Sequence, residues 1–457
     1  MTNSAEFEPQ TKGTVPTTLT RILRLAVDVR EEEVRALLWS CLYFFCVLSA
    51  YYIIRPIRDD MGVAGEVRNL PWLITGTLVA MVAVHPLFST LVVKIPRNRF
   101  VPMTYRFFMA NLLLFFVLLK VLPEDRIVWV GRAFFIWTSV FNLFVVSVFW
   151  AVMSDVFQTS QSKRLFGFIG AGGTLGGLVG AGITATLAEA LGPVQLLIVS
   201  IVLLEIGVQC LRGLSGDSVG SAPTTRAGKQ ESEGAPIGGG VLAAIPHILR
   251  SGYLLGICAY MLLYTIVGTL LYLQQADLVD QAFSDRAVRT VFFARIDFVV
   301  NALTLLTQMF LTGRIIRLLG VALTLTLLPA VCVIGFAALG FLPTLGVLVV
   351  FQVLRRASNY AVARPARETL YTVVSREDKY KSKSLIDTFV YRAGDLVGAW
   401  SYSIMGLLGL SIAGIAFIVV PLAFVWWKCG FWLGQRQAIL ARDREAESGT
   451  LTAPSNP

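Results

Sequence analysis

Four arginines lie in an apolar stretch that is long enough to cross a membrane. Arg355, Arg356, Arg364 and Arg367 follow the run PTLGVLVVFQVL, so the first two stand near mid-depth of the predicted span at 343–374. An arginine that faces lipid at the bilayer centre costs roughly 2.5 to 3.5 kcal/mol on insertion scales. These side chains must therefore face a wet space enclosed by protein, where guanidinium groups are suited to bind anionic oxygens.

Helical spacing places most of these cations on one face. At 100° per residue, three cations and two aromatic side chains share an arc of about 80°: Arg356, Tyr360, Arg364, Arg367 and Tyr371. Glu368 stands four residues after Arg364, and we expect the two to pair. This face predicts the lining of a pathway that handles anions.

The next predicted span, 384–408, repeats the combination of charge and aromatic side chains. Asp387, Tyr391 and Asp395 recur at i, i+4 and i+8, and Arg392 stands three residues before Asp395. Arg392 is a candidate to bind substrate, whereas the two aspartates and Glu368 are candidates for gating or coupling.

The first span ends in two arginines on either side of a proline. Arg55 and Arg58 flank Pro56 and are followed by Asp59 and Asp60. If the helix continues past the proline, both arginines lie on one face and meet an anion from the first half of the chain. The alternative is a helix end at which the arginines extend to the membrane surface.

A polar stripe runs along the eighth predicted span. Asp297, Asn301, Thr304 and Gln308 recur at i, i+4, i+7 and i+11 in an otherwise apolar helix. Such a stripe must face protein or water within a membrane. Asn301 is a candidate for substrate binding and Asp297 for coupling, although polar packing between helices explains the pattern equally well.

Tyrosines follow a similar stripe in the seventh span. Tyr253, Tyr260 and Tyr264 recur at i, i+7 and i+11, with Gln275 close to the same face. Aromatic faces can stack any nucleobase, which makes Tyr264 a candidate binding residue. Plain helix packing is the favoured interpretation of the stripe as a whole.

Two further features lie around the fifth span. Its glycines recur every four residues in FGFIGAGGTLGGLVGAG without a phosphate-binding motif, which indicates close helix packing. Asp155 ends the fourth span beside Lys163 and Arg164. It forms either a gating ion pair or an ordinary charge at a helix end.

The composition excludes a soluble globular protein. Hydrophobic residues make up 55% of the 457 residues and charged residues 15%, whereas soluble domains carry about 25% charge. The net charge of +10 arises from basic residues that flank apolar runs, which is typical of membrane topology and not of nucleic-acid binding. The cysteines lack CxxC spacing and the two histidines are far apart, so we expect no metal, no cofactor and no catalytic residues.

Twelve apolar runs are long enough to span a membrane. They lie at about 36–55, 70–93, 101–122, 131–154, 165–189, 193–212, 247–274, 289–311, 315–339, 343–374, 384–408 and 411–433. These runs predict a tail at 1–35 ending in an amphipathic stretch, a first six-helix bundle at 36–212, a flexible linker at 213–246, a second bundle at 247–433 and a tail at 434–457. Lys and Arg gather in the tails, the linker and alternate loops, which predicts that both termini are cytoplasmic.

The predicted fold is an all-α membrane protein with twelve transmembrane helices in two six-helix halves. This organisation resembles the major facilitator architecture, in which substrate binds near mid-membrane between two repeats. The loop and span QTSQSKRLFGFIGAGGTLGG also weakly resembles REDKYKSKSLIDTFVYRAGDLVG in the second half.

Three sequence stretches resemble the bacterial branch of the ATP:ADP antiporter, or nucleotide transporter, family, which is related to the major facilitators. They are YYIIRPIRDDMG at 51–62, RLFGFIGAGG at 164–173 and RPARETLYTVVSREDKYKSK at 364–383. The resemblance covers roughly 35–430. It implies nucleotide exchange across a membrane, with essential cations at Arg55 or Arg58 and at Arg392, and acidic partners at Asp155 and Asp297. The chain has Arg-Pro-Ile-Arg where a Lys-Asp pair is expected, so the fold carries over more firmly than ATP as cargo.

The leading hypothesis is a secondary transporter of an organic anion, such as ATP or ADP, that works by alternating access in a bacterial inner membrane. We expect a monomer in the lipid bilayer, without nucleic acid and without enzymatic activity. One alternative is a proton-coupled symporter of another anion that uses Asp297, Glu368 or Asp395 as the proton carrier. The other is a membrane scaffold that transports nothing, although a scaffold has no need of arginines at mid-depth.

Overall fold

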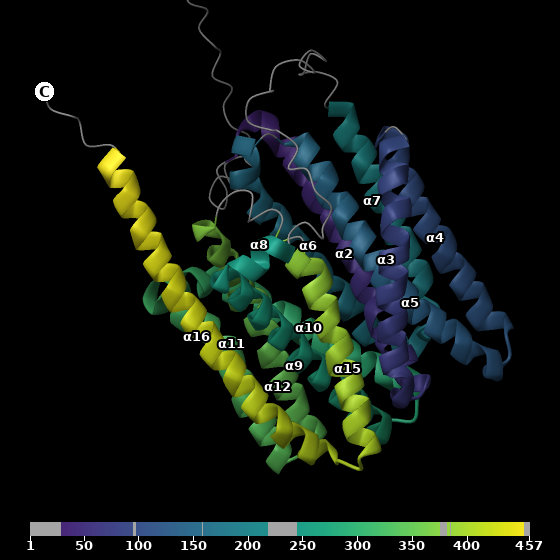
Figure 1. The fold of residues 1–457 in the computed structure, drawn as a ribbon. Coiled ribbons are helices and arrows are strands. Elements are labelled where there is room, and N and C mark those ends of the chain that lie inside the picture. The colour runs from purple at the N-terminus through teal and green to yellow at the C-terminus, as the bar shows by residue number, and fades with distance from the viewer. Residues whose placement is uncertain are drawn as a thin grey trace, which may run out of the picture.

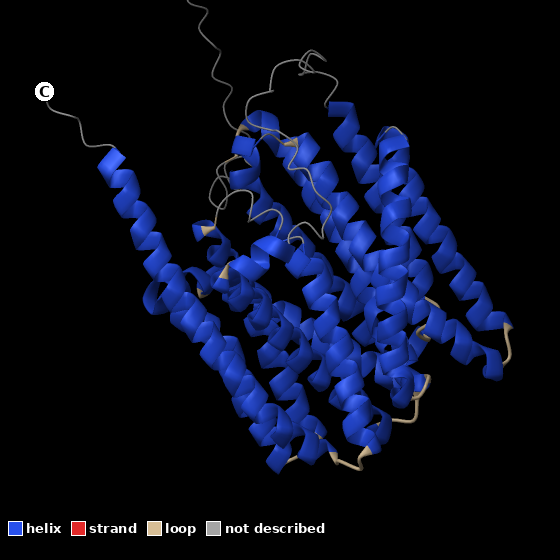
Figure 2. Ribbon diagram, viewed as in Figure 1, coloured by secondary structure: helices blue, strands red, loops and turns tan. Residues whose placement is uncertain are grey.

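The computed structural model describes residues 29–94, 97–157, 159–217, 245–374, 382–383 and 385–451. The regular structure of these residues is helical, without strands (Figure 1 and Figure 2). The amphipathic stretch predicted to end the first tail lies mostly outside this part of the chain, as does most of the predicted linker. The first half consists of α2 (Glu31–Ala64), η1 (Val67–Asn69), α3 (Leu70–Lys94), α4 (Arg97–Val121), α5 (Glu124–Val156), α6 (Thr159–Leu191) and α7 (Leu196–Asp217).

The described part of the second half begins with the short helix α8 (Ile245–Arg250), which six longer helices follow. Its long helices are α9 (Gly252–Ala282), α10 (Arg286–Phe310), α11 (Thr312–Phe341), α12 (Leu345–Ser358), α15 (Tyr391–Leu407) and α16 (Ile412–Leu451). Between α12 and α15 the described residues include the π-helical turn η4 (Asn359–Ala363), α13 (Arg364–Thr369), the 3-10 turn η5 (Leu370–Val373) and the π-helical turn η6 (Ile386–Val390).

Ten helices of the described residues are long and apolar enough to cross a membrane. Each coincides with one of the twelve predicted spans. The other two predicted spans, 343–374 and 384–408, are divided into shorter helical segments at the places where charged side chains gather. The predicted all-α membrane fold is therefore confirmed, and the two interrupted spans are those that carry the candidate site.

The chain begins α2 and ends α16 on the same side of the molecule (Figure 1). We call this the terminal side, and the other the opposite side. Helix α16 continues to Leu451, well beyond the predicted end of the last span at 433. It therefore includes much of the polar stretch that follows that span. The predicted domain boundaries otherwise stay predictions.

Apolar side chains form two cores, one in each half. The first joins residues of α2 to α7, and the second joins residues of α9 to α16. The two cores interlock through residues of one half that are buried in the core of the other: Val63, Val67, Leu70, Leu73 and Phe135 in the second core, and Val291 in the first. Most of them lie where α2 ends, in η1 and where α3 begins, so this apolar contact lies on the opposite side.

The glycines of α6 allow its backbone to approach α2 closely. A Cβ atom at Gly176 would lie 2.3 Å from the Phe45 carbonyl oxygen, and one at Gly180 would lie 2.3 Å from that of Ser49. The Ser49 hydroxyl donates a hydrogen bond of 2.9 Å to the Gly176 carbonyl oxygen. The glycine pattern thus serves helix packing, as the sequence indicated.

Replacing Gly176 by alanine is expected to destabilise the protein. The new methyl group would meet a backbone oxygen that cannot rotate away, and overpacking of this kind costs about 1–3 kcal/mol. Gly170→Ala on the same helix is the matched control, because a Cβ there has nothing within 4 Å. Thermal unfolding of the purified variants should show a lower midpoint for Gly176→Ala alone, and equal midpoints for the two would contradict the packing role.

Candidate functional site

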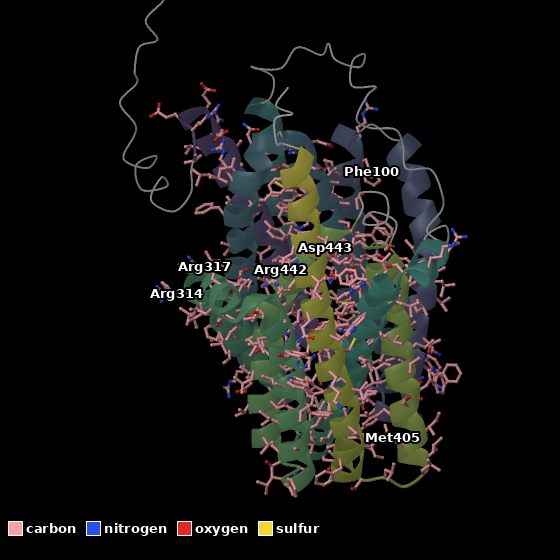
Figure 3. All side chains as sticks on the ribbon, turned by 60° about the vertical axis from the view of Figure 1, so that its left-hand side comes forward. Phe100, Arg314, Arg317, Met405, Arg442 and Asp443 are labelled. Atoms are coloured by element: carbon pink, nitrogen blue, oxygen red, sulfur yellow. The ribbon has the colours of Figure 1, made fainter. Side chains whose placement is uncertain are left out.

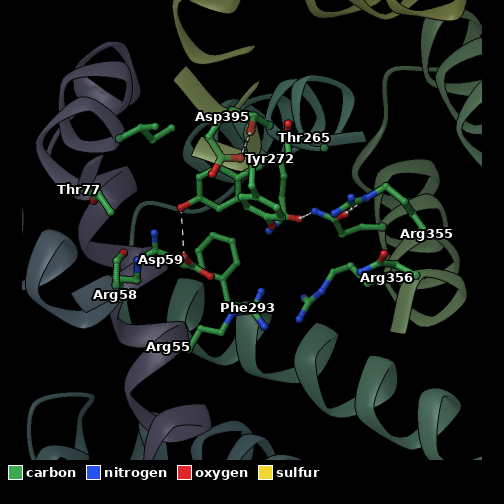
Figure 4. A pocket seen from close by; sticks show the side chains of 18 of the residues that line it. Arg55, Arg58, Asp59, Thr77, Thr265, Tyr272, Phe293, Arg355, Arg356 and Asp395 are labelled. Atoms are coloured by element: carbon green, nitrogen blue, oxygen red, sulfur yellow. Dashed lines mark hydrogen bonds and ion pairs between the residues drawn. The ribbon is translucent and has the colours of Figure 1, made fainter. Parts of the chain in front are cut away.

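A cavity of about 240 Å³ lies between the two halves at mid-depth (Figure 4). Helices α2, α3 and α5 line it from the first half, and α9, α10, α12 and α15 from the second. Its charged lining residues are Arg55, Arg58, Arg355, Arg356, Arg392, Asp59, Asp297 and Asp395. Five cations thus face three carboxylates, and the excess positive charge favours an anionic ligand.

Asp297 connects two arginines that come from different halves. Its carboxylate oxygen lies 2.6 Å from Nη2 of Arg356 and 3.4 Å from Nη1 of Arg55. The Asp297 side chain is only 3% exposed, so its charge is buried between these two cations. The carboxylate shields the arginines from each other while no other anion is present.

The two remaining ion pairs of the cavity lie within one half each. Arg58 lies 3.1 Å from Asp59, and its guanidinium group stands 3.9 Å above the centre of the Phe135 ring. Arg392 lies 3.1 Å from Asp395, so the predicted i, i+3 proximity becomes an ion pair. Thr269 donates a further hydrogen bond of 3.0 Å to Asp395.

Two more cavities lie toward the terminal side and adjoin the central one. A cavity of about 320 Å³ shares Tyr264, Asn359, Tyr360 and Tyr391 with the central cavity. A cavity of about 420 Å³ between the halves also includes Tyr360. Tyr360 lines all three cavities, which adjoin one another at this residue and which we together call the pathway.

The arginine face predicted from helical spacing divides between these spaces. Arg356 and Tyr360 line the central cavity, whereas Arg364, Arg367 and Tyr371 line the cavity of about 320 Å³. The π-helical turn η4, which contains Tyr360, lies between Arg356 and Arg364. A single inserted residue of this kind rotates the following side chains by about 100°, so one helical face can serve two cavities.

The unusual turn is stabilised by side chains from neighbouring helices. Thr312 donates a hydrogen bond of 2.8 Å to the carbonyl oxygen of Ala361, and Gln308 donates one of 3.3 Å to that of Tyr360. These bonds occupy carbonyl groups in the turn. The stripe residue Gln308 therefore has a structural role in addition to its place in a cavity wall.

The polar stripe of α10 faces the pathway. Asp297 lines the central cavity, and Asn301, Thr304 and Gln308 line the cavity of about 420 Å³. The Asn301 amide donates 2.9 Å to the Asp297 carbonyl oxygen of its own helix. Asn301, Thr304 and Gln308 thus line the pathway on the terminal side of the buried Asp297 carboxylate.

The tyrosine stripe of α9 divides between packing and the pathway. The hydroxyl groups of Tyr253 and Tyr260 each donate 2.9 Å to a backbone carbonyl oxygen, those of Leu370 and Leu325. Tyr260 also lines the cavity of about 320 Å³. Tyr264 lines two of the cavities, and the guanidinium group of Arg367 stands 4.7 Å above its ring. Tyr253 thus serves packing, Tyr260 serves packing and also forms part of a cavity wall, and Tyr264 remains a candidate binding residue.

The predicted pairing of Glu368 with Arg364 is wrong. Glu368 instead lies 2.5 Å from Nζ of Lys383, which the chain brings back from beyond η5. Arg364 is exposed at the cavity wall. A partner from a more distant part of the chain thus replaces the i, i+4 neighbour, although Arg364 and Glu368 both lie in α13.

Two other acidic candidates lie nearer the terminal side. Asp387 is exposed and lines the cavity of about 320 Å³. Asp155 is exposed near the end of α5 and belongs to none of these three cavities. Arg164, one of its predicted partners, donates 2.9 Å to Glu33 on α2, and the side chain of Lys163 lies outside the described residues.

Two lining residues, Gln352 and Asn359, escaped the sequence analysis. Together with Arg355 and Arg356, which the sequence predicted to face an enclosed wet space, they line the central cavity at the i, i+3, i+4, i+7 spacing of one helix face. That spacing was present in the sequence, but the predicted face was drawn through Arg356 and the later arginines. Tyr272 shows no such signal, because its place depends on how α9 packs.

Polar contacts join the two halves on the opposite side of the molecule, beyond the central cavity. Asp60 of α2 is 1% exposed and lies 2.7 Å from Nε of Arg289 and 3.2 Å from Nε of Arg286, both on α10. The Tyr272 hydroxyl donates 3.1 Å to Asp59. We call Asp60, Arg286 and Arg289 the opposite-side ion cluster.

Two tryptophans also contribute to the contact between the halves on the opposite side. Trp400 of α15 donates 3.2 Å from its indole nitrogen to the Thr75 hydroxyl of α3. Its ring also meets the ring of Trp72 edge to face at 4.8 Å. Together with the interlocked apolar cores, these contacts hold the halves together beyond the cavity.

The fold is similar to that of solved membrane transporters. A bacterial homologue of the iron transporter ferroportin in an inward-facing state superposes with a TM-score of 0.60 at 12% identity, covering 89% of this chain and 99% of that one. The nucleoside transporter NupG gives 0.53 at 11% identity, covering 90% and 100%. An inward-facing bacterial homologue of the lysosomal transporter Spinster gives 0.52 at 12%, covering 91% and 94%.

The sequence is similar to ADP,ATP carrier proteins. It is 26% identical over 239 residues to ADP,ATP carrier protein 2 of Chlamydia pneumoniae, which covers 46% of this chain and 43% of that relative. It is 20% identical over 501 aligned positions to ADP,ATP carrier protein 1 of Chlamydia muridarum, covering 93% of each. No family model matches the chain. The resemblance expected from the sequence is confirmed, and these relatives are carrier proteins.

Proposed function

We propose that the protein exchanges nucleotides or similar organic anions across a membrane by alternating access. The observation that carries this proposal is the central cavity, where both halves direct arginines at one buried space. Phosphate oxygens suit guanidinium groups, which can donate two parallel hydrogen bonds. The tyrosines shared with the adjoining cavity, Tyr264, Tyr360 and Tyr391, offer faces for a nucleobase.

The charges of the cavity favour exchange over one-way release. A cavity with more cations than carboxylates resists closing when it is empty, because closure would bury like charges without a countercharge. A bound anion offsets this repulsion and permits the halves to change orientation. The carrier would then return only with a second anion.

We further propose that the protein is a monomer in a bacterial inner membrane, with its terminal side in the cytoplasm. The basic tails and linker support this orientation through the bias of Lys and Arg toward the cytoplasm. The ADP,ATP carriers to which it is similar support a nucleotide as the transported anion. The pathway would then be hollow toward the cytoplasm.

Counterflow in proteoliposomes tests the exchange. Vesicles loaded with ADP are expected to take up labelled ATP, whereas vesicles without internal nucleotide are expected to take up almost none. Efflux of labelled internal ADP that runs equally well without external nucleotide would contradict exchange. Uptake that follows an imposed pH gradient and ignores internal nucleotide would instead favour the proton-coupled symporter.

A further inference from the structure

One arginine of the central cavity has no carboxylate partner among the described residues. Arg55, Arg58, Arg356 and Arg392 each lie within 4 Å of an aspartate. Arg355, by contrast, lines the cavity beside neutral side chains. Its full positive charge is therefore available to a ligand.

Two buried glutamines hold the Arg355 side chain in place. The Nε atom of Arg355 donates 3.1 Å to the Gln352 side-chain oxygen, and the Gln352 amide donates 2.5 Å to the side-chain oxygen of Gln275 on α9. Gln352 and Gln275 are 3% and 4% exposed. Because Nε is occupied, the two terminal nitrogens are the ones left to bind a ligand.

Helix α9 also leaves room for the guanidinium group. A Cβ atom at Gly268 would lie 3.1 Å from Nη1 of Arg355, closer than ordinary van der Waals contact. Gly268 itself lines the cavity. A side chain at this position would press on the nitrogen that faces the cavity space.

From these three observations we infer that Arg355 is the primary anchor for the phosphate chain of the transported anion, and that Gln352, Gln275 and Gly268 position it. The inference rests on the proposed function, because it assigns the phosphate group of that ligand to one end of the central cavity. Neutral amides fix the direction of the arginine without cancelling its charge. A carboxylate partner would have to be displaced before phosphate could bind.

Binding of inorganic pyrophosphate to the purified protein tests this assignment. We expect pyrophosphate to raise the thermal unfolding temperature of the unchanged protein, and Arg355→Gln to weaken the apparent affinity at least tenfold. Arg355→Lys keeps the charge but loses the planar fork, so its affinity should fall between the two. Arg314→Gln is the control, because Arg314 is an exposed arginine at the beginning of α11, away from the cavity (Figure 3).

The positioning residues have a distinct expected signature. Gln352→Leu and Gly268→Ala leave every charge in place, so each should raise the pyrophosphate dissociation constant severalfold while Arg355→Gln raises it most. Unfolding temperatures without ligand report whether each variant folds. The inference is overturned if the unchanged protein does not bind pyrophosphate, or if folded Arg355→Gln and Arg355→Lys both bind it as well as the unchanged protein.

The outcomes separate this inference from the proposed function. Pyrophosphate binding that depends on Arg355, together with failed counterflow of ATP against ADP, would reject nucleotide exchange and keep the anchor. Successful counterflow by Arg355→Gln with an unchanged KM would keep exchange and reject the anchor.

Discussion

Asp60→Asn is expected to open the opposite side of the protein. The substitution removes the countercharge of Arg289, whose side chain is only 7% exposed. Breaking a buried ion pair by removing one partner costs about 3–5 kcal/mol when the remaining charge stays buried. Because Asp60 and Arg289 belong to different halves, separation of the halves relieves this cost by admitting water.

Accessibility of a cavity residue measures this opening. A cysteine introduced at Thr77, which lines the central cavity, can be labelled with a membrane-impermeant thiol reagent added from the opposite side. We expect Asp60→Asn to raise the labelling rate about tenfold, which corresponds to a shift of about 1.4 kcal/mol in the conformational equilibrium. The parent protein without Thr77→Cys corrects for labelling of the native cysteines.

Asp125→Asn is the matched control for the opposite-side ion cluster. Asp125 is exposed in the first turn of α5, so its replacement removes the same charge without breaking a buried pair. Its labelling rate should equal that of the unchanged protein. Equal labelling rates for Asp60→Asn and Asp125→Asn would mean that the opposite-side ion cluster does not hold the halves together.

Arg356→Gln is expected to abolish uptake and to destabilise the protein. Its loss leaves the Asp297 carboxylate, which is 3% exposed, with Arg55 as its remaining ion-pair partner at 3.4 Å. Breaking the shorter of the two buried ion pairs should cost about 3–5 kcal/mol. Thermal unfolding and ATP uptake into ADP-loaded proteoliposomes measure the two effects separately.

The double variant Arg356→Gln and Asp297→Asn distinguishes stability from transport. Removing both charges should restore most of the unfolding temperature, because no unpaired buried charge remains from this pair. Uptake should stay abolished if Arg356 binds the substrate. Recovery of uptake together with stability would mean that the pair is purely structural. Arg317→Gln, an exposed arginine on α11, controls for loss of charge alone (Figure 3).

The sequence by itself determined the membrane class, the spans and most of the arginines that line the pathway. These conclusions depend on local properties, because the cost of exposing a charge to lipid depends on the apolar residues around it. Helical spacing likewise placed Asp297, Asn301, Thr304 and Gln308 on one face, since that face is a property of one helix. The fold class follows for the same reason.

Only the tertiary structure decided which charges meet. Asp297 joins Arg55 and Arg356, Asp60 joins Arg289, and Glu368 pairs with Lys383 instead of its helical neighbour Arg364. Such pairs depend on how distant helices pack, and the π-helical turn η4 further changes the direction of side chains within one span. The inferred role of Arg355 depends on packing in the same way. Only the arrangement of the helices shows that no carboxylate of the described residues pairs with it.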